Sequence, residues 1–151
     1  GSANFDQKFL ENVHIASLLH DIGKIGVPEF ILNKPGKLTA EEFEIMKRHT
    51  TNGVEILKPL LELKDAFDGV KFHHERYDGS GYPEGLKGDA IPMVAAIIAV
   101  ADTYDAMITD RPYRKGLSKE DAVGEIKNNI LRQFHFQPAQ ALIELYQQGK
   151  I

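Results

Sequence analysis

Residues 93–102 read Met-Val-Ala-Ala-Ile-Ile-Ala-Val-Ala-Asp. A helix over this segment has almost no polar face, so it must be largely buried inside the domain. Pro92 suits its first turn, and the helix is predicted to end near Asp110. A buried and unpaired Asp102 carboxylate would cost several kcal/mol, so it needs a cation, a donor network or a metal. A metal is the simplest such partner.

The rest of the chain also shows helical periodicity, interrupted by short clusters of glycine and proline. Thr39 and Glu42 have the spacing of a capping box, in which each side chain satisfies a free amide at the start of a helix. Further helices are predicted over residues 6–22, as a stub at 30–32, from Thr39 to residue 57, over 60–74, from Ser118 onward, and from Pro138 to Gly149. These elements make an all-α fold.

Composition narrows the class of protein. The length of 151 residues and the 42% hydrophobic content fit one domain with a single core, spanning residues 1–151. The longest apolar run, residues 90–101, is well short of the roughly 20 residues that span a bilayer. With 18 basic and 22 acidic residues and no long basic stretch, binding to DNA by bulk charge is not expected. We expect a cytoplasmic domain without membrane contact.

Several side chains have the chemistry of metal ligands. The chain has no cysteine, so a metal would have to be held by imidazole and carboxylate groups. The candidates, each at or near a predicted helix, are His20, Asp21, His49, His73, His74 and Asp102. Adjacent residues differ by about 100° around a helix, so both members of a pair reach one site only in a crevice between helices. A lone histidine is more often structural, which is how we interpret His14 and His135.

Basic side chains near these candidates have two interpretations each. Lys24 lies three residues after Asp21, where it either forms an ordinary ion pair or acts as a cation beside a bound phosphate. Arg111 and Arg114 follow the apolar helix directly, as a solvated basic turn or as a pair of phosphate-binding forks. The residues alone leave these alternatives open.

A glycine-rich segment narrows the choice of family. Residues 78–85 read Asp-Gly-Ser-Gly-Tyr-Pro-Glu-Gly and follow the adjacent histidines His73-His74. Together with residues 20–24 (His-Asp-Ile-Gly-Lys), His49 and Asp102, this pattern resembles the HD-GYP family. The resemblance covers about residues 16–138. A His-Asp pair alone would indicate only the broad HD superfamily of phosphohydrolases.

The resemblance implies an HD-superfamily helical bundle with a Gly-rich GYP loop. It also implies a metal-dependent phosphodiesterase that hydrolyses cyclic di-GMP to pGpG, GMP or both, in bacterial two-component signalling. Two or three divalent ions, iron or manganese, would be bound. One ion would be held by His20, Asp21 and Asp102, and the other by Asp21, His49, His73 and His74, with Asp21 bridging.

The resemblance also assigns roles around the substrate. Asp21 and Lys24 would be catalytic, and Lys24 and Arg111 would face the phosphates. Arg114 would assist them, and Tyr82 would lie near the ligand.

The start of the chain predicts a truncated domain. Gly1-Ser2 resembles a protease scar, and only nineteen residues precede His20, whereas the family usually has an earlier helix that carries a glutamate ligand. We therefore expect a piece of a longer signalling protein, with a sensor or receiver domain upstream. Loss of that ligand would leave the domain weakly active or inactive.

Two departures from the family pattern keep a second interpretation open. Ala96 stands where arginine is common, and Gln137 stands where aspartate is usual. The alternative is a catalytically impaired domain that binds cyclic di-GMP or docks a partner, such as a diguanylate cyclase (GGDEF) domain, through the GYP loop. An HD-superfamily enzyme acting on ppGpp or other nucleotides is a third interpretation, but it gives no reason for the glycine-rich loop.

Overall fold

The computed structural model describes residues 5–111 and 114–151. Gly1-Ser2 and the Pro112-Tyr113 pair lie outside these described residues. Within them every regular element is a helix, apart from two isolated β-bridges. The all-α prediction is confirmed.

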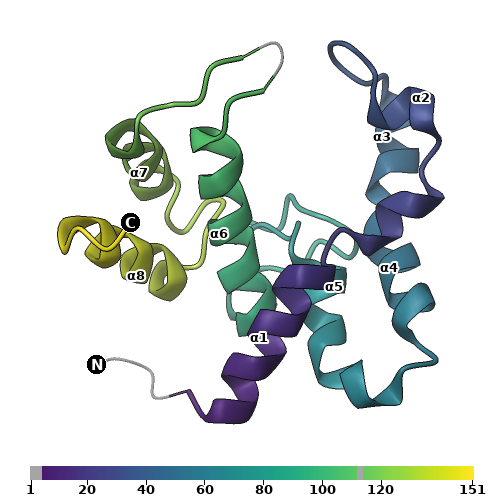
Figure 1. Ribbon diagram of the computed structural model, residues 1–151, viewed down its shortest axis with the longest axis horizontal. Coiled ribbons are helices and arrows are strands. Elements are labelled where there is room, and N and C mark those ends of the chain that lie inside the picture. The colour runs from purple at the N-terminus through teal and green to yellow at the C-terminus, as the bar shows by residue number, and fades with distance from the viewer. Residues whose placement is uncertain (1–4, 112–113) are drawn as a thin grey trace.

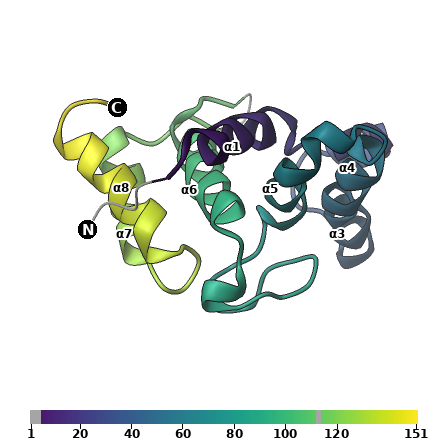
Figure 2. The same cartoon turned by 90° about the horizontal axis from the view of Figure 1, so that it is seen from below.

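The helices are short and follow one another closely. In chain order they are α1 (Gln7–Leu19), η1 (Ile22–Gly26), α2 (Glu29–Leu32), α3 (Ala40–Lys47), α4 (His49–Leu57), η2 (Leu61–Ala66), α5 (Phe67–Phe72), η3 (Gly88–Ala90), α6 (Met93–Ile108), α7 (Lys119–Asn128) and α8 (Phe136–Gln147), where η marks a 3-10 helix. Helices α7 and α8 lie at one end and α2 to α4 at the other, with α1, α5 and α6 between them (Figure 1). The view turned by 90° shows the same arrangement (Figure 2).

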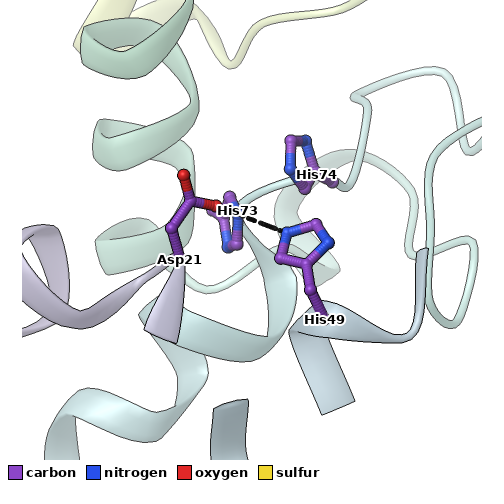
Figure 3. Close-up of side chains that lie close together, drawn as sticks. All are labelled: Asp21, His49, His73 and His74. Atoms are coloured by element: carbon purple, nitrogen blue, oxygen red, sulfur yellow. Dashed lines mark hydrogen bonds and ion pairs between the residues drawn. The ribbon is translucent and has the colours of Figure 1, made fainter. Parts of the chain in front are cut away.

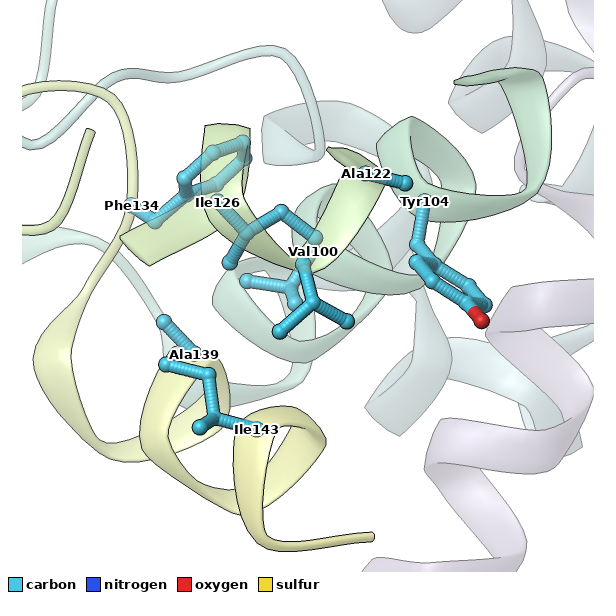
Figure 4. Packing of buried hydrophobic residues seen from close by; sticks show 8 residues of the cluster. Val100, Tyr104, Ala122, Ile126, Phe134, Ala139 and Ile143 are labelled. Atoms are coloured by element: carbon cyan, nitrogen blue, oxygen red, sulfur yellow. The ribbon is translucent and has the colours of Figure 1, made fainter. Parts of the chain in front are cut away.

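Helix α6 is the central element, as its lack of a polar face predicts. Its buried residues are Val94, Ala95, Ala96, Ile98, Val100 and Tyr104. One side packs on α1 and α5, where Ala16 joins the cluster of Val94 and Ile98. The other side packs on α7 and α8, where Val100 meets residues such as Ile126 (Figure 4). A membrane crossing would need a longer or more apolar helix than any that the described residues form.

Two of the predicted helix starts have the expected caps. The Thr39 hydroxyl accepts a hydrogen bond from the Glu42 amide, and the Thr39 amide donates to the Glu42 carboxylate, which completes the capping box. The Ser118 hydroxyl accepts from the Asp121 amide at the start of α7. Each cap satisfies an amide that the helix itself leaves free.

Two other helix starts differ from the prediction. Pro92 precedes α6 as its cap instead of lying in its first turn. Helix α8 begins two residues before Pro138, because the His135 side chain caps it by accepting from the Gln137 amide. His135 is therefore a structural histidine, as predicted, with a role that periodicity did not show.

Two predicted helices are broken close to the candidate ligands. Helix α1 ends at Leu19 instead of residue 22, and the chain continues as the 3-10 helix η1. The helix that starts after Thr39 is interrupted at Arg48, so that His49 opens the new helix α4. At these breaks η1 and α4 are in close contact: a Cβ atom on Gly23 would lie only 1.9 Å from the His49 carbonyl oxygen.

A substitution of Gly23 tests this contact. We expect Gly23→Ala to destabilise the domain by at least about 3 kcal/mol, because the added methyl group meets backbone atoms that cannot move independently. The matched control is Gly124→Ala in α7, where an added Cβ meets nothing within 4 Å. That change should stabilise the domain by about 0.5–1 kcal/mol, because alanine favours a helix interior. Urea denaturation measures both, and equal stabilities would contradict the proposed contact.

Candidate metal centre

Four candidate ligands converge at the ends of helices. Asp21, His49, His73 and His74 offer ligand atoms that all lie within 4.8 Å of one another (Figure 3). Asp21 follows α1, His49 opens α4, and the other two histidines follow α5. The structure therefore brings together the four residues that the resemblance assigns to one ion.

Backbone hydrogen bonds orient the imidazole rings. The Nδ1 atoms of three histidines pair with the carbonyl three residues earlier: His20 with Ser17, His49 with Met46, and His73 with Val70, at 2.7, 2.7 and 2.9 Å. A carbonyl oxygen only accepts, so Nδ1 must carry the hydrogen, and Nε2 of the neutral ring keeps its lone pair. Metal-binding imidazoles in proteins are commonly fixed in this way.

The contact between two of these rings fits a cation. Nε2 of His49 and Nε2 of His73 are 3.4 Å apart. With both Nδ1 atoms protonated, two lone pairs face each other, which is unfavourable unless a positive ion lies between them. Ligand atoms about 2.1 Å from a shared metal ion are themselves roughly 3.0–3.5 Å apart. The spacing and the donor types both suit a divalent metal.

A second group of ligand atoms shares Asp21 with the first. His20 Nε2 lies 3.6 Å from Asp21 Oδ2 and 3.6 Å from Asp102 Oδ1. The other carboxylate oxygen, Asp21 Oδ1, lies 3.6 Å from His49 Nε2. His20 Nε2 is buried and has no hydrogen-bond partner among the described residues. Asp21 thus stands between two groups of ligands, in the arrangement that the resemblance implies for a bridging carboxylate.

The expected burial of Asp102 is wrong. Its side chain is 40% exposed, because it lies on a side of α6 that faces a crevice. Partial burial alone would raise the pKa of Asp102, but the contact with His20 has the larger effect and the pKa is lowered. The carboxylate is therefore ionised by its neighbours and by solvent, not forced to find a metal by deep burial.

Three of the candidate histidines, His49, His73 and His74, are held neutral. Burial lowers the pKa of His73 to about 3 and that of His74 to about 4, and it lowers the pKa of His49 as well. The pKa of His20 is instead raised by the Asp102 carboxylate. At neutral pH the buried rings therefore present lone pairs with no proton to displace, as metal binding requires.

The cluster is open to solvent on the side of its carboxylates. Asp21 is 39% exposed, whereas His49 is 1% exposed. A crevice of about 290 Å³ runs beside the cluster, and its lining includes Phe43, His73, His74, Arg76, Tyr82, Asp102 and Gln133. Structural metal sites are closed by protein ligands, whereas catalytic ones keep a position open. This site has the open form.

Glu75 holds the glycine-rich loop beside the histidines. Its buried carboxylate accepts hydrogen bonds from the backbone amides of residues 84, 85 and 86 at 2.7, 3.1 and 3.0 Å. Gly81 lies so close to the preceding turn that a Cβ atom there would be 2.5 Å from the His74 carbonyl oxygen. The folded loop stacks Tyr82 on His74, with ring centroids 4.8 Å apart and planes 25° from parallel.

The predicted cationic residues differ in their contacts: Lys24 pairs with Asp21, whereas the two arginines pair elsewhere. Lys24 Nζ lies 2.6 Å from Asp21 Oδ2, because η1 turns it back toward the cluster. Burial alone would raise the pKa of Asp21, but the Lys24 ammonium together with His20 and His49 outweighs it, and the pKa is lowered. Arg111 and Arg114 pair their backbones with each other, and the Arg114 guanidinium donates to the Ala106 carbonyl at 2.9 Å. Among the described contacts, neither arginine touches the cluster.

Other residues of the crevice were missed by the sequence analysis. Phe43 is 43% exposed on α3 and meets Tyr82 edge to face at 5.9 Å, with Lys47 Nζ 5.5 Å from its ring centroid. A large apolar side chain on the polar helix α3 was a signal that could have been used. Arg76 and Gln133 also line the crevice, and their positions in the sequence carry no comparable signal.

Comparison with protein families decides the classification. The family model described as HD domain matches residues 2–139. The chain belongs to this family. Solved structures similar to this HD domain include an HDG"Y"P protein from Bdellovibrio bacteriovorus, with a TM-score of 0.73, 22% identity, and coverage of 95% of this chain and 45% of that one. The resemblance to the HD-GYP family is confirmed, and the structural likeness shows the fold.

Relatives with similar sequences are larger proteins. The HD domain is 52% identical over 124 residues to a protein from Thermotoga maritima named cyclic di-GMP phosphodiesterase, covering 80% of this chain and 33% of that protein. It is 45% identical over 121 residues to the cyclic di-GMP phosphodiesterase response regulator RpfG of Xanthomonas campestris, covering 74% and 30%. It is 40% identical over 151 residues to 3'3'-cGAMP-specific phosphodiesterase 2 of Vibrio cholerae, covering 96% and 27%. The chain spans about a third or less of these relatives.

The buried histidines should make the metal-free domain sensitive to acid. Between about pH 6.5 and 4 the unfolded chain binds more protons than the folded one, because the pKa values of His73 and His74 are lowered to about 3 and 4 only on folding. The free energy of unfolding should therefore fall as the pH falls through this window, by up to about 1.4 kcal/mol per pH unit for each histidine. The raised pKa of His20 adds stability above this window, as the pH falls to about 6.5, and this contribution then stays constant through the window.

Urea denaturation with a chelator, from pH 7.5 to 4.5, measures this dependence. His73→Gln should flatten the slope, whereas His14→Gln, a change of an exposed histidine on α1, should keep it. A stability that does not change with pH would contradict the burial of neutral rings.

Proposed function

We propose that this HD domain is a metal-dependent phosphodiesterase that hydrolyses cyclic di-GMP to pGpG, GMP or both. The observation that carries the proposal is the convergence of lone pairs on an open crevice, with Asp21 between His20 and His49. The names of the Thermotoga and Xanthomonas relatives support cyclic di-GMP as the substrate. The name of the Vibrio relative, a 3'3'-cGAMP-specific phosphodiesterase, supports the broader class of cyclic dinucleotides.

The donor set suits two divalent ions. We assign one to His20, Asp21 and Asp102, and the other to Asp21, His49, His73 and His74. Imidazole and carboxylate donors without thiolate fit iron or manganese. When bound, such ions supply Lewis acidity toward phosphoryl oxygens and an activated water.

Protein side chains would complete the chemistry. Lys24 is 41% exposed beside Asp21, so its ammonium can face a phosphate and stabilise the oxygen that leaves. Burial raises the pKa of Tyr82, so its hydroxyl stays protonated and can donate to the ligand. We also assign phosphate contacts to Arg111 and Arg114, which require the Arg114 guanidinium to leave the Ala106 carbonyl.

The two departures from the family pattern, at Ala96 and Gln137, do not support the alternative of a catalytically impaired domain. Ala96 is 5% exposed and packs with Phe72 and Ile91. Gln137 lines a different, apolar groove beside α8. Since neither residue lines the crevice, we favour the catalytic assignment over a domain that only binds the dinucleotide or docks a diguanylate cyclase (GGDEF) domain.

The domain is proposed to be the output module of a bacterial signalling protein with a sensor or receiver domain upstream. The Thermotoga and Xanthomonas relatives are more than twice its length, and the name of the Xanthomonas protein identifies a response regulator.

The central experiment measures metal content and hydrolysis of cyclic di-GMP by the full-length protein, which includes the expected upstream helix, after anaerobic loading with iron or manganese. We expect bound metal and formation of pGpG or GMP. Asp21→Asn should reduce turnover at least about 100-fold, because an amide cannot replace a carboxylate shared by two ions and even residues outside the ligand set cost 10–100-fold. Metal-loaded protein that never cleaves the dinucleotide would contradict the proposed activity.

A second experiment separates the two interpretations of Lys24. Lys24→Met should lower kcat by about 100-fold or more while the metal content stays unchanged, because the cation acts on developing charge. Lys58→Met is the matched control, since Lys58 forms an ordinary exposed ion pair with Glu55 at the same three-residue spacing. If both variants keep full activity, Lys24 is only a surface ion pair.

A further inference from the structure

One wall of the crevice carries polar side chains that the proposed hydrolysis does not use. Arg76 comes from the turn between α5 and the glycine-rich loop, and Gln133 comes from the segment between α7 and α8. Backbone hydrogen bonds join the two segments, since the Tyr77 amide donates to the Gln133 carbonyl at 3.1 Å. The wall is therefore built from two fixed pieces of backbone.

The Arg76 guanidinium is held by only one of its edges. Its Nε donates to Ser80 Oγ at 3.0 Å, and Ser80 Oγ in turn donates to Asp78 Oδ1 at 2.6 Å. The Ser80 amide donates to the same Asp78 oxygen at 2.9 Å, which fixes the serine. Among the described residues, the two terminal amino groups of Arg76 have no hydrogen-bond partner. The fork is thus oriented but still able to bind a ligand.

The dimensions suit one part of a dinucleotide. A volume of about 290 Å³ is at the lower limit of the roughly 300–1,000 Å³ found for sites that bury a whole drug-sized ligand. The crevice also contains His73, His74 and Asp102, where the phosphate would bind. A base attached to that phosphate is then within the same crevice that Arg76 and Gln133 line.

We propose that Arg76 is a specificity-determining residue that reads the O6 and N7 edge of a guanine base of the substrate. This inference rests on the proposed function of the same site. An arginine fork matches the two acceptors of guanine, whereas adenine presents an amino donor at the position of O6. Glutamine has the opposite preference, because it pairs with the N6 and N7 atoms of adenine. The Gln133 carboxamide oxygen can accept from the other edge of guanine.

The same fork could instead bind a phosphate, which every cyclic dinucleotide carries. The two roles differ in their effect on affinity. A phosphate contact strengthens the binding of all cyclic dinucleotides equally, whereas a contact to guanine strengthens only the binding of those that contain guanine. The ratio of affinities therefore separates the roles, and general damage to the loop does not change it.

The test measures dissociation constants in the presence of Mn²⁺ for phosphorothioate analogues of cyclic di-GMP, 3'3'-cGAMP and cyclic di-AMP, which resist hydrolysis. The wild-type chain should bind the cyclic di-GMP analogue roughly 5- to 150-fold more tightly than the cyclic di-AMP analogue. Arg76→Gln should abolish or reverse this order. Arg76→Lys should keep it, because lysine also pairs with O6 and N7.

Arg132→Gln is the matched control, because it removes the same charge from the neighbouring segment at an exposed position that does not line the crevice. It should leave the order unchanged. A wild-type chain without preference for guanine, or an Arg76→Gln variant that weakens all three analogues equally, would overturn the inference. Preference for guanine without any hydrolysis of cyclic di-GMP would instead contradict the proposed function alone.

Discussion

Gly23 has no side chain to hold η1 away from α4, and the site depends on that contact. Because the two backbones touch, Asp21 at the start of η1 reaches His49 at the start of α4, with 3.6 Å between Oδ1 and Nε2. The other ligands come from the ends or faces of α1, α5 and α6, which pack on one another through small residues such as Ala16. Short rigid helices that end at a common point hold ligands more precisely than a loop would.

The arrangement of His49 and His73 is electrostatically unfavourable without a cation, and this suits it to a metal. His49 and His73 lose hydration on burial and turn their lone pairs toward each other, so folding without a cation leaves an unfavourable contact. The same burial lowers their pKa values, so that no proton has to leave these rings before an ion enters. Asp21 and Asp102 stay ionised at the exposed side and supply the negative charge that an ion needs. Folding thus prepares both the neutral and the charged donors.

Sequence patterns predicted the features that depend on local chemistry. The buried helix α6, the capping box at Thr39 and the set of metal-ligand types followed from apolar periodicity, capping chemistry and the lack of cysteine. The features that depend on tertiary contacts were not predicted. The interruption at Arg48 accompanies the close contact between η1 and α4, and the exposure of Asp102 accompanies the crevice on its side of α6. The role of Glu75 depends on amides nine to eleven residues away. No local pattern contains these distances.

The two walls of the crevice differ in chemistry because they come from opposite ends of the domain. Phe43 lies on α3 and meets Tyr82, whereas Gln133 lies between α7 and α8 and is joined to the glycine-rich loop (Figure 1). Three of the candidate ligands lie between these ends: His73 and His74 directly after α5, and Asp102 on α6. An aromatic wall stacks any base, since every base has a flat face, whereas a wall of fixed hydrogen-bonding groups distinguishes one base edge from another. A molecule with a phosphate at the centre and a base on each side matches this division, with affinity supplied mainly at one wall and selectivity at the other.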